Sequence, residues 1–152
     1  MRALIQRVTN ASCKVNNKIV GKINNGLLVF VAFTDGDTDL EIDYMVDKII
    51  NLRIFDDDNG VMNKSLLDTN GSVLSISQFT LYADCKKGRR PNYIRALSGD
   101  LSTTLYDKFN EKMTKKNVVV ETGLFGADMK ISLVNDGPVT IMLEKENING
   151  KK

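Results

Sequence analysis

The segment SVLSISQFTLY, residues 72–82, reads as a β-strand whose side-chain alternation changes phase in its middle. Leu74 and Ile76 are apolar on one parity, whereas Phe79 and Leu81 are apolar on the other. Because side chains of a strand alternate between its two faces, a slip of one residue indicates a bulge or a strand end, where side chains are re-aimed and N–H groups are freed. Such a position suits a binding site, although a bulge without function would give the same pattern.

Further strands are predicted on both sides of this segment from short apolar or β-branched runs. They are expected at residues 3–8, 18–23, 27–32, 53–55, 118–121, 129–134 and 139–143. Asn24-Asn25-Gly26 is expected to form a hairpin turn between the second and the third of these strands. Asn135-Asp136-Gly137-Pro138 joins the last two.

Two amphipathic helices are predicted. Thr38-Asp39-Leu40-Glu41 has the spacing of a capping box, and apolar residues follow it at i, i+3, i+4 and i+7 from Ile42 to Ile49. The second helix follows Ser98-Gly99-Asp100 and repeats an apolar residue at every fourth position from Leu101 to Met113. The expected fold is a single α/β domain with about seven strands and two main helices, the helices covering one face of a sheet-on-sheet core.

Composition indicates one globular domain over residues 1–146, followed by a flexible C-terminal tail at residues 147–152. The chain has 152 residues, of which 42% are hydrophobic and 26% are charged. No apolar run is long enough to span a membrane and no secretory signal is visible, so a cytoplasmic protein is expected. Cys13 and Cys85 form no CxxC pair, which argues against both a disulfide framework and a zinc site.

The chain contains no histidine. This absence excludes a Ser-His-Asp triad, a Cys-His pair and an imidazole metal site, so any chemistry must rely on backbone groups, hydroxyls, amides or the substrate. The acidic run at residues 56–60 lacks the ligand pattern of a calcium loop and is expected to be an exposed turn. No metal and no cofactor are predicted.

Positive charge is concentrated in one segment, although the net charge is only +2. Lys86, Lys87, Arg89 and Arg90 lie within five residues, directly before Pro91. A charge run of this kind is often a solvated loop, but it is also typical of a contact with nucleic-acid phosphates. A second basic cluster at residues 112–116 falls where the second helix should end, and complementarity to the helix dipole is sufficient to explain it.

Three segments together carry a family resemblance: SQFTL at residues 77–81, GLFGADM at 123–129 and NDGPVT at 135–140. With them, nearly the whole chain from residue 3 to residue 143 resembles the D-aminoacyl-tRNA deacylases of the D-tyrosyl-tRNA deacylase type. The resemblance implies a homodimeric cytosolic hydrolase with a three-layer α/β/β fold. Its substrate would be tRNA charged with a D-amino acid or with glycine, and its active sites would lie at the dimer interface.

The resemblance also implies roles for single residues. Ser77, Gln78, Phe79 and Thr80 would form the catalytic segment. Substrate contacts would come from Leu81, Phe125 and Met129, together with Gly137 and Pro138, which would reach in from the other subunit with a cis peptide bond. The tRNA contacts would come from Arg7, Lys86, Lys87, Arg89 and Arg90. For Phe125 and Met129, core packing is the alternative reading.

Two hydrolytic mechanisms are open. Thr80 is a candidate nucleophile, but no base near it in the sequence would activate its hydroxyl. We favour attack by water assisted by the 2′-hydroxyl of the terminal ribose, with N–H groups of Phe79 and Thr80 stabilising the oxyanion. Carbonyls around Gly137-Pro138 would hold the substrate's α-ammonium group so that an L side chain collides with the wall, whereas glycine is accepted. The competing function classes are a non-catalytic RNA-binding dimer and a purely structural subunit.

Overall fold

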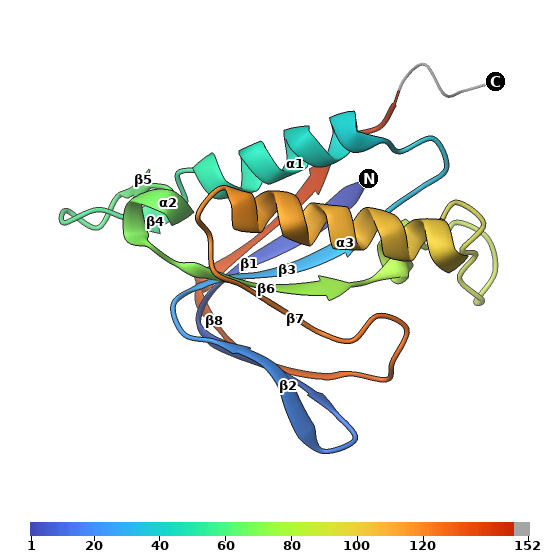
Figure 1. Ribbon diagram of the computed structural model, residues 1–152, viewed down its shortest axis with the longest axis horizontal. Helices are drawn as coiled ribbons and strands as arrows, with labels where there is room; N and C mark the ends of the chain where they lie inside the picture. The colour runs from blue at the N-terminus through green and yellow to red at the C-terminus, as the bar shows by residue number, and fades with distance from the viewer. Residues whose placement is uncertain (148–152) are drawn as a thin grey trace.

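Strand β1 is the centre of the fold, because three other strands pair with it. The computed structural model describes residues 1–147 (Figure 1). Its elements in chain order are β1 (Arg2–Val15), β2 (Lys18–Ile23), β3 (Gly26–Ala32), α1 (Asp39–Asn51), β4 (Phe55–Asp56), β5 (Met62–Lys64), α2 (Leu66–Thr69), β6 (Ser72–Ser77), the 3₁₀ helix η1 (Phe79–Tyr82), α3 (Gly99–Lys115), β7 (Val120–Thr122) and β8 (Lys130–Glu144). The first half of β1 pairs with β3 and its second half with β2, while β8 runs antiparallel along nearly all of it. Strands β6 and β7 extend the sheet in parallel from β3.

Helices α1 and α3 cover one face of this sheet (Figure 1). The core between them contains Ile5 and Val29 from the sheet and Ile49 and Phe109 from the helices, all fully buried. Burial of such side chains supplies most of the favourable free energy of folding. The predicted helical faces are therefore confirmed, except that Leu101 lies on the exposed side of α3.

A second core lies on the other face of the sheet. Cys13, Leu28 and Leu74 belong to this cluster, and irregular register between β1 and β8 near Val8 lets both long strands bend around it. Because alternate residues of β3 enter opposite cores, the sheet is a middle layer between the helices and the curled part formed by β2, the end of β1 and the start of β8. The predicted single α/β domain with helices on one face is confirmed.

The predicted hairpin between residues 18–23 and 27–32 is wrong. Strands β2 and β3 pair with different halves of β1 and not with each other. The tight hairpin joins β1 to β2 through Asn16 and Asn17, whose φ angles of 49° and 62° suit asparagine. Gly26 has another role, because a Cβ atom there would lie 1.8 Å from the carbonyl oxygen of Ser72, so glycine allows β6 to approach β3.

The strand predicted over residues 72–82 ends at Ser77, and the phase slip marks the change from β6 to η1. The two strands predicted at 129–134 and 139–143 form one strand, β8, with irregular pairing around residues 135–140. The strand expected at 53–55 is the two-residue β4, which forms a small separate sheet with β5. The acidic run after it is an exposed turn, as predicted.

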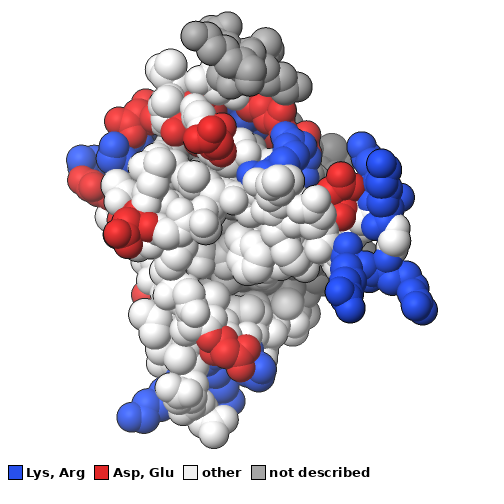
Figure 2. All heavy atoms as spheres, turned by 90° about the vertical axis from the view of Figure 1, so that its right-hand side faces the viewer, with Lys and Arg blue, Asp and Glu red and all other residues white. Residues whose placement is uncertain are grey.

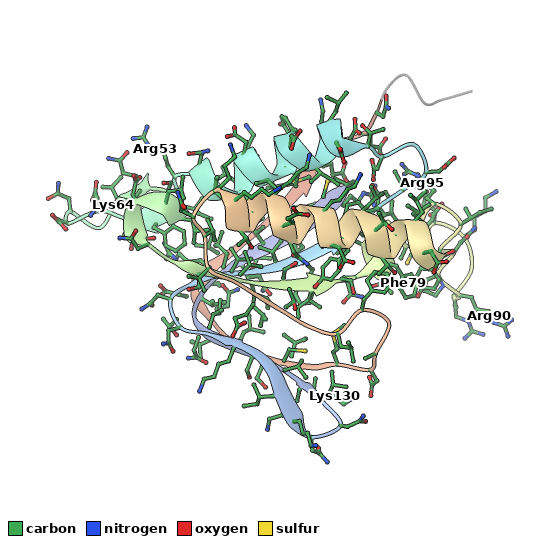
Figure 3. All side chains as sticks on the ribbon, in the orientation of Figure 1. Arg53, Lys64, Phe79, Arg90, Arg95 and Lys130 are labelled. Atoms are coloured by element: carbon green, nitrogen blue, oxygen red, sulfur yellow. The ribbon has the colours of Figure 1, made fainter. Side chains whose placement is uncertain are left out.

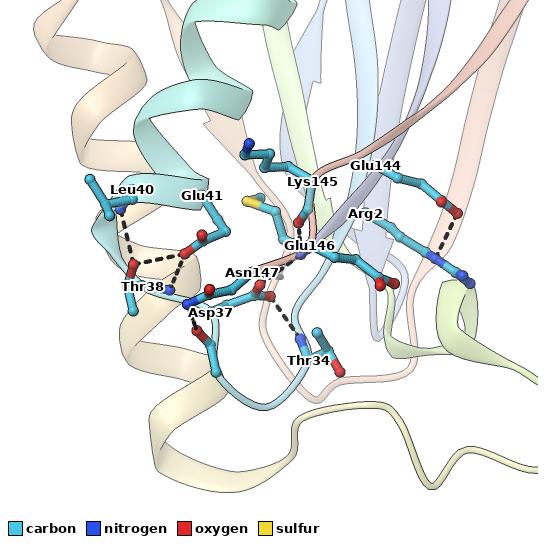
Figure 4. A network of polar contacts seen from close by, with 12 residues as sticks. Arg2, Thr34, Asp37, Thr38, Leu40, Glu41, Glu144, Lys145, Glu146 and Asn147 are labelled. Carbon is cyan, nitrogen blue, oxygen red and sulfur yellow. Dashed lines mark hydrogen bonds and ion pairs between the residues drawn. The ribbon is translucent and has the colours of Figure 1, made fainter. Parts of the chain in front are cut away.

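The capping box of α1 is present, and the start of the chain is fastened beside it (Figure 4). The main-chain N–H of Thr38 donates to the Glu41 carboxylate at 2.7 Å. The α-ammonium group of Met1 donates to the Asp37 carboxylate at 2.8 Å, and both groups are buried. At the predicted tail, Asn147 donates to the carbonyl oxygen of Gly36 at 3.3 Å, and residues 148–152 lie outside the described residues. Within residues 1–147, no helix has the length and apolar character that crossing a bilayer requires.

Candidate active site at the end of strand β6

The junction between β6 and η1 opens onto a cavity of about 380 Å³. Four segments line it: residues 31–33 at the end of β3, 76–79 at the junction, 97–99 with Ser102 at the start of α3, and 125–127 with Met129 and Ile131 before and within β8. The main-chain N–H of Gln78 donates to the carbonyl oxygen of Val31 at 2.8 Å, which fixes the junction against β3. A cavity at the carboxyl ends of adjacent parallel strands is a common position for ligand sites in α/β proteins.

None of the residues that line this cavity carries an ionisable side chain. Its side-chain polar groups are the hydroxyls of Ser77, Ser98 and Ser102 and the amide of Gln78. Ser98 is the N-cap of α3, but its side chain does not cap the helix, so first-turn N–H groups of α3 have no side-chain partner from it. The site therefore offers neutral donors and an apolar wall, which suits binding and polarisation of an ester more than acid–base catalysis.

Of the seven residues predicted to form the pocket from within one chain, five line the cavity and two do not. Ser77, Gln78, Phe79, Phe125 and Met129 are on its wall, whereas Thr80 and Leu81 are not among the lining residues. The hydroxyl of Thr80 accepts a hydrogen bond from the side-chain amide of Gln78. The carbonyl oxygen of Leu81 accepts one from Arg2 at 2.8 Å. Phe125 both lines the cavity and packs against the core, because its ring also contacts the buried ring of Tyr106, with 5.7 Å between the ring centroids.

The peptide bond between Gly137 and Pro138 is cis, as the family resemblance implied. Both residues are exposed, and a hydrogen bond from Arg7 fixes the turn that contains them. The Arg7 guanidinium donates to the carbonyl oxygen of Asp136 at 3.0 Å and to that of Ile54 at 2.8 Å. Its Nη1 also lies 3.3 Å from the Asp56 carboxylate.

Arg7 was expected to contact tRNA, but only 7% of its surface is exposed. Its donors are used by main-chain carbonyls and carboxylates of this chain, so its place is in the support of the Gly137-Pro138 turn. The sequence gives no sign of this burial, because a lone arginine in an alternating strand is normally exposed.

Within one chain, the Gly137-Pro138 turn and the cavity lie far apart. The turn lies between the pairs Val8–Asn135 and Gln6–Thr140, and Arg7 between them pairs with Leu27 on β3. The cavity begins at Val31, four residues further along β3. At about 3.3 Å per residue, this separation is about 13 Å along the strand. A single chain therefore does not bring its turn and its cavity together.

The basic segment forms an exposed loop at the cavity end of the molecule. Figure 3 shows Arg90 projecting near Phe79. In Figure 2, where the right-hand side of Figure 1 faces the viewer, lysine and arginine side chains gather at the right margin. The loop is closed by Asp84 and Asn92, whose main-chain groups exchange hydrogen bonds of 2.8 and 2.9 Å. Within residues 1–147, no ion pair involves the four basic side chains of this loop, so their charges face solvent.

Cysteine and acidic side chains provide no alternative centre in the described part of the chain. Cys13 is buried in the second core, where burial raises the pKa of its thiol, and Cys85 is exposed. Residues 1–147 contain no cluster of three or more His, Cys, Asp or Glu side chains placed to hold a metal ion. Ser98, Gly99 and Ser102 also line the cavity, although the pattern of residues 98–102 predicts only the start of a helix.

Comparisons with known proteins agree with the fold and cover almost the whole chain. The family described as D-Tyr-tRNA(Tyr) deacylase matches residues 4–144. The D-aminoacyl-tRNA deacylase of Thermosipho africanus is 55% identical over 148 residues, covering 97% of this chain and 99% of its own. That of Bacillus pumilus is 53% identical over 146 residues, covering 96% and 99%.

Two solved structures have the same fold. One, described as a c-Myc DNA unwinding element binding protein, has a TM-score of 0.91 and 37% identity over 97% of this chain and 100% of that chain. The other, described as a probable eukaryotic D-amino acid tRNA deacylase, has a TM-score of 0.80 over 93% of this chain and 97% of its own. At 22% identity, the second likeness shows the fold alone.

Proposed function

The chain belongs to the D-Tyr-tRNA(Tyr) deacylase family, and from this premise we propose that it hydrolyses the ester between a D-amino acid and the terminal ribose of tRNA. Glycine attached to tRNA is a second substrate, and the products are the free amino acid and tRNA. The observation that carries the proposal is the cavity at the β6–η1 junction, which the family motif Ser77-Gln78-Phe79 lines without any ionisable group. An aminoacyl ester is already activated, so electrostatic stabilisation by neutral donors is sufficient to accelerate its hydrolysis.

The carbonyl of the ester sits against the start of η1. The N–H groups of Phe79 and Thr80 belong to the first turn of this helix and have no acceptor within it, so they are available to an oxyanion. Gln78 lines the cavity and orients the substrate or the attacking water. The 2′-hydroxyl of the terminal ribose assists the water, because no side chain of the lining acts as a base.

Thr80 holds the side chain of Gln78 in position and does not act as the nucleophile. Its hydroxyl oxygen accepts a hydrogen bond from Gln78, and no lysine or carboxylate side chain in residues 1–147 is hydrogen-bonded to it to remove its proton. An unassisted hydroxyl is a weak nucleophile.

The working unit is a homodimer in which each cavity is completed by the Gly137-Pro138 turn of the other subunit. Two observations support this. The turn is exposed and lies about 13 Å along β3 from the cavity of its own chain. Leu4, Phe30 and Met142 are also neighbours in register on the sheet face away from α1 and α3, and 46% of Met142 is exposed, which suits an interface.

The site selects D substrates because it excludes L-aminoacyl substrates. Carbonyl groups of the turn hold the α-ammonium group of the substrate, and an L side chain then points into the wall while a D side chain points out. Gly137 leaves space at this point because it has no Cβ atom. Glycine esters have no side chain to reject, so they are hydrolysed as well.

Release of amino acid from D-aminoacyl-tRNA, L-aminoacyl-tRNA and glycyl-tRNA by the purified protein tests the proposal, with a chelator present throughout. We expect hydrolysis of the D and glycyl esters and retention of the L ester. Binding of tRNA without hydrolysis would instead identify a non-catalytic RNA-binding protein, the alternative that the basic loop favours. Sedimentation equilibrium on the same sample measures whether the chain is dimeric.

A further inference from the structure

Two exposed aromatic rings stand at the mouth of the cavity. Phe79 and Tyr93 form an edge-to-face pair with 5.1 Å between ring centroids and an interplanar angle of 73°. Phe79 also lines the cavity, whereas Tyr93 lies outside it. Their exposed fractions are 55% and 39%. Single exposed aromatic residues are common, but two exposed rings packed together beside a cavity form an apolar surface on which a planar ligand can stack.

Tyr93 is held in place by the main chain around it. The N–H of Ile94 donates to the side-chain oxygen of Asn92 at 2.9 Å, and the carbonyl oxygen of Tyr93 accepts from Ala96 at 2.9 Å. Leu97 then donates to the carbonyl oxygen of Phe33 at 2.9 Å, which ties the segment to the end of β3. The ring is therefore presented by an ordered segment.

The basic loop separates the two aromatic residues in the sequence and adjoins them in space. Residues 84 and 92 close the loop, and Tyr93 follows directly. The four cationic side chains of the basic loop are exposed and form no ion pairs within the described chain. Cationic side chains beside a stacking aromatic surface are the usual combination at sites for single-stranded nucleic acid.

We propose that Tyr93, supported by Phe79, stacks against the base of the nucleotide that precedes the esterified terminal adenosine of tRNA. This inference rests on the proposed function and extends it to the single-stranded 3′ end of the substrate. The ester enters the cavity beyond Phe79, the preceding base lies on Tyr93, and the phosphates of the strand face Lys86, Lys87, Arg89 and Arg90. Stacking tolerates any base, so Tyr93 contributes affinity for the strand without selecting its sequence.

The test compares two substrates with the same ester: full-length D-aminoacyl-tRNA and D-aminoacyl-adenosine, which has no preceding nucleotide. For each protein the readout is the ratio of kcat/KM on tRNA to kcat/KM on the nucleoside. Tyr93→Ala should lower this ratio about tenfold, the usual effect of removing one stacking contact. Tyr93→Phe should keep the ratio, because the ring remains.

Tyr44→Ala is the matched control, since Tyr44 is a tyrosine of similar exposure, 42%, on α1. Its ratio should equal that of the wild type. A tRNA with an abasic site before the terminal adenosine supplies a second measurement. The abasic site should lower kcat/KM of the wild type by the same factor and add no further loss in Tyr93→Ala.

Equal losses on both substrates in Tyr93→Ala, or no loss on either, would overturn the stacking role while leaving the proposed hydrolysis intact. Additive losses from the abasic site and from Tyr93→Ala would also overturn it, because the two changes would then act independently. If the wild type hydrolyses neither substrate, the proposed function fails first, and the stacking inference fails with it.

Discussion

The guanidinium group of Arg7 donates a 3.0 Å hydrogen bond to the main-chain carbonyl oxygen of Asp136. Arg7 belongs to β1, and Asp136 directly precedes Gly137, so one buried side chain fastens the turn to the centre of the sheet. A second bond, to the carbonyl oxygen of Ile54, ties the same side chain to the segment after α1. The turn is thus supported by contacts that are distant in sequence.

Replacing Arg7 by Met should lower the free energy of unfolding by about 3 kcal/mol, because the buried carbonyl oxygen of Ile54 and the partly buried one of Asp136 lose their donors. Hydrolysis of D-aminoacyl-tRNA should also fall at temperatures where the variant is folded. Urea denaturation and turnover measure the two effects. Arg53→Met is the control, since Arg53 is exposed and bonds to Asn63 on the surface. Equal effects of the two substitutions would contradict the supporting role of Arg7.

Gly137→Val should abolish turnover. The φ angle of Gly137 is +129°, and a Cβ atom there would lie 2.9 Å from the Val139 side chain and 3.1 Å from that of Arg7. Mixing this chain with a Ser77→Trp chain, whose cavity is filled, tests the cross-subunit arrangement. Random pairing makes half of the dimers heterodimers, each with one intact composite site, so about a quarter of wild-type activity should return. Confirmed heterodimers without activity would mean that each site is built within one chain.

Thr80→Ala separates the two hydrolytic mechanisms. If the terminal ribose assists the water, the variant should keep activity within about tenfold of the wild type, whereas a 2′-deoxy terminal adenosine should abolish turnover by the wild type. If Thr80 is the nucleophile, the variant should lose several orders of magnitude, and a covalent intermediate should be trapped by rapid quenching. Full activity on the 2′-deoxy substrate would exclude the assisted mechanism.

Replacing Lys86, Lys87, Arg89 and Arg90 together by Ala should weaken tRNA binding and flatten its salt dependence. Each phosphate contact contributes roughly 0.7 to 0.9 to the slope of log K against log salt, so the slope should fall by about 3. Binding isotherms at several salt concentrations measure it. Removing Lys112, Lys115 and Lys116 at the end of α3 should leave the slope unchanged. An unchanged slope in the loop variant would show that the loop is a solvated surface and does not contact phosphates.

The dependence of kcat/KM on pH should contain no inflection from the enzyme between about pH 6 and pH 9, because no residue that lines the cavity ionises. The only inflection expected is that of the substrate's α-amino group. It should move when the amino acid is changed and stay in place when the protein is changed. An inflection common to all substrates would reveal a general acid or base that the cavity does not show.

Local signals predicted the elements whose formation depends on neighbouring residues. The Thr38 capping box and the phase slip at Ser77-Gln78 were both informative for this reason. Strand pairing was less predictable, because Asn16-Asn17 and Asn24-Asn25-Gly26 are equivalent turn signals and only tertiary packing distinguishes them.

In the candidate site, too, local signals were predictive and long-range contacts were not. Its motif residues at 77–79 were found from the sequence, since the phase slip in the alternation marks the end of β6 there. The wall at residues 97–102 was not found, because α3 reaches β6 only after 21 intervening residues, 78–98, and no periodicity reports such a contact. The burial of Arg7 was missed for a similar reason, as its partners lie 47 and 129 residues away.

The pairing of β1 with β8 has a consequence for how the protein is made. Among the described elements β1 leaves the ribosome before all the others, whereas β8 (130–144), which completes its second edge, follows them all. During synthesis, β1 therefore exposes an unpaired edge and half of an unfinished core, which is the condition in which nascent chains aggregate. Stable folding of this sheet must await the synthesis of β8, so chaperones that shield early strands should matter more for this chain than for proteins whose early strands pair locally.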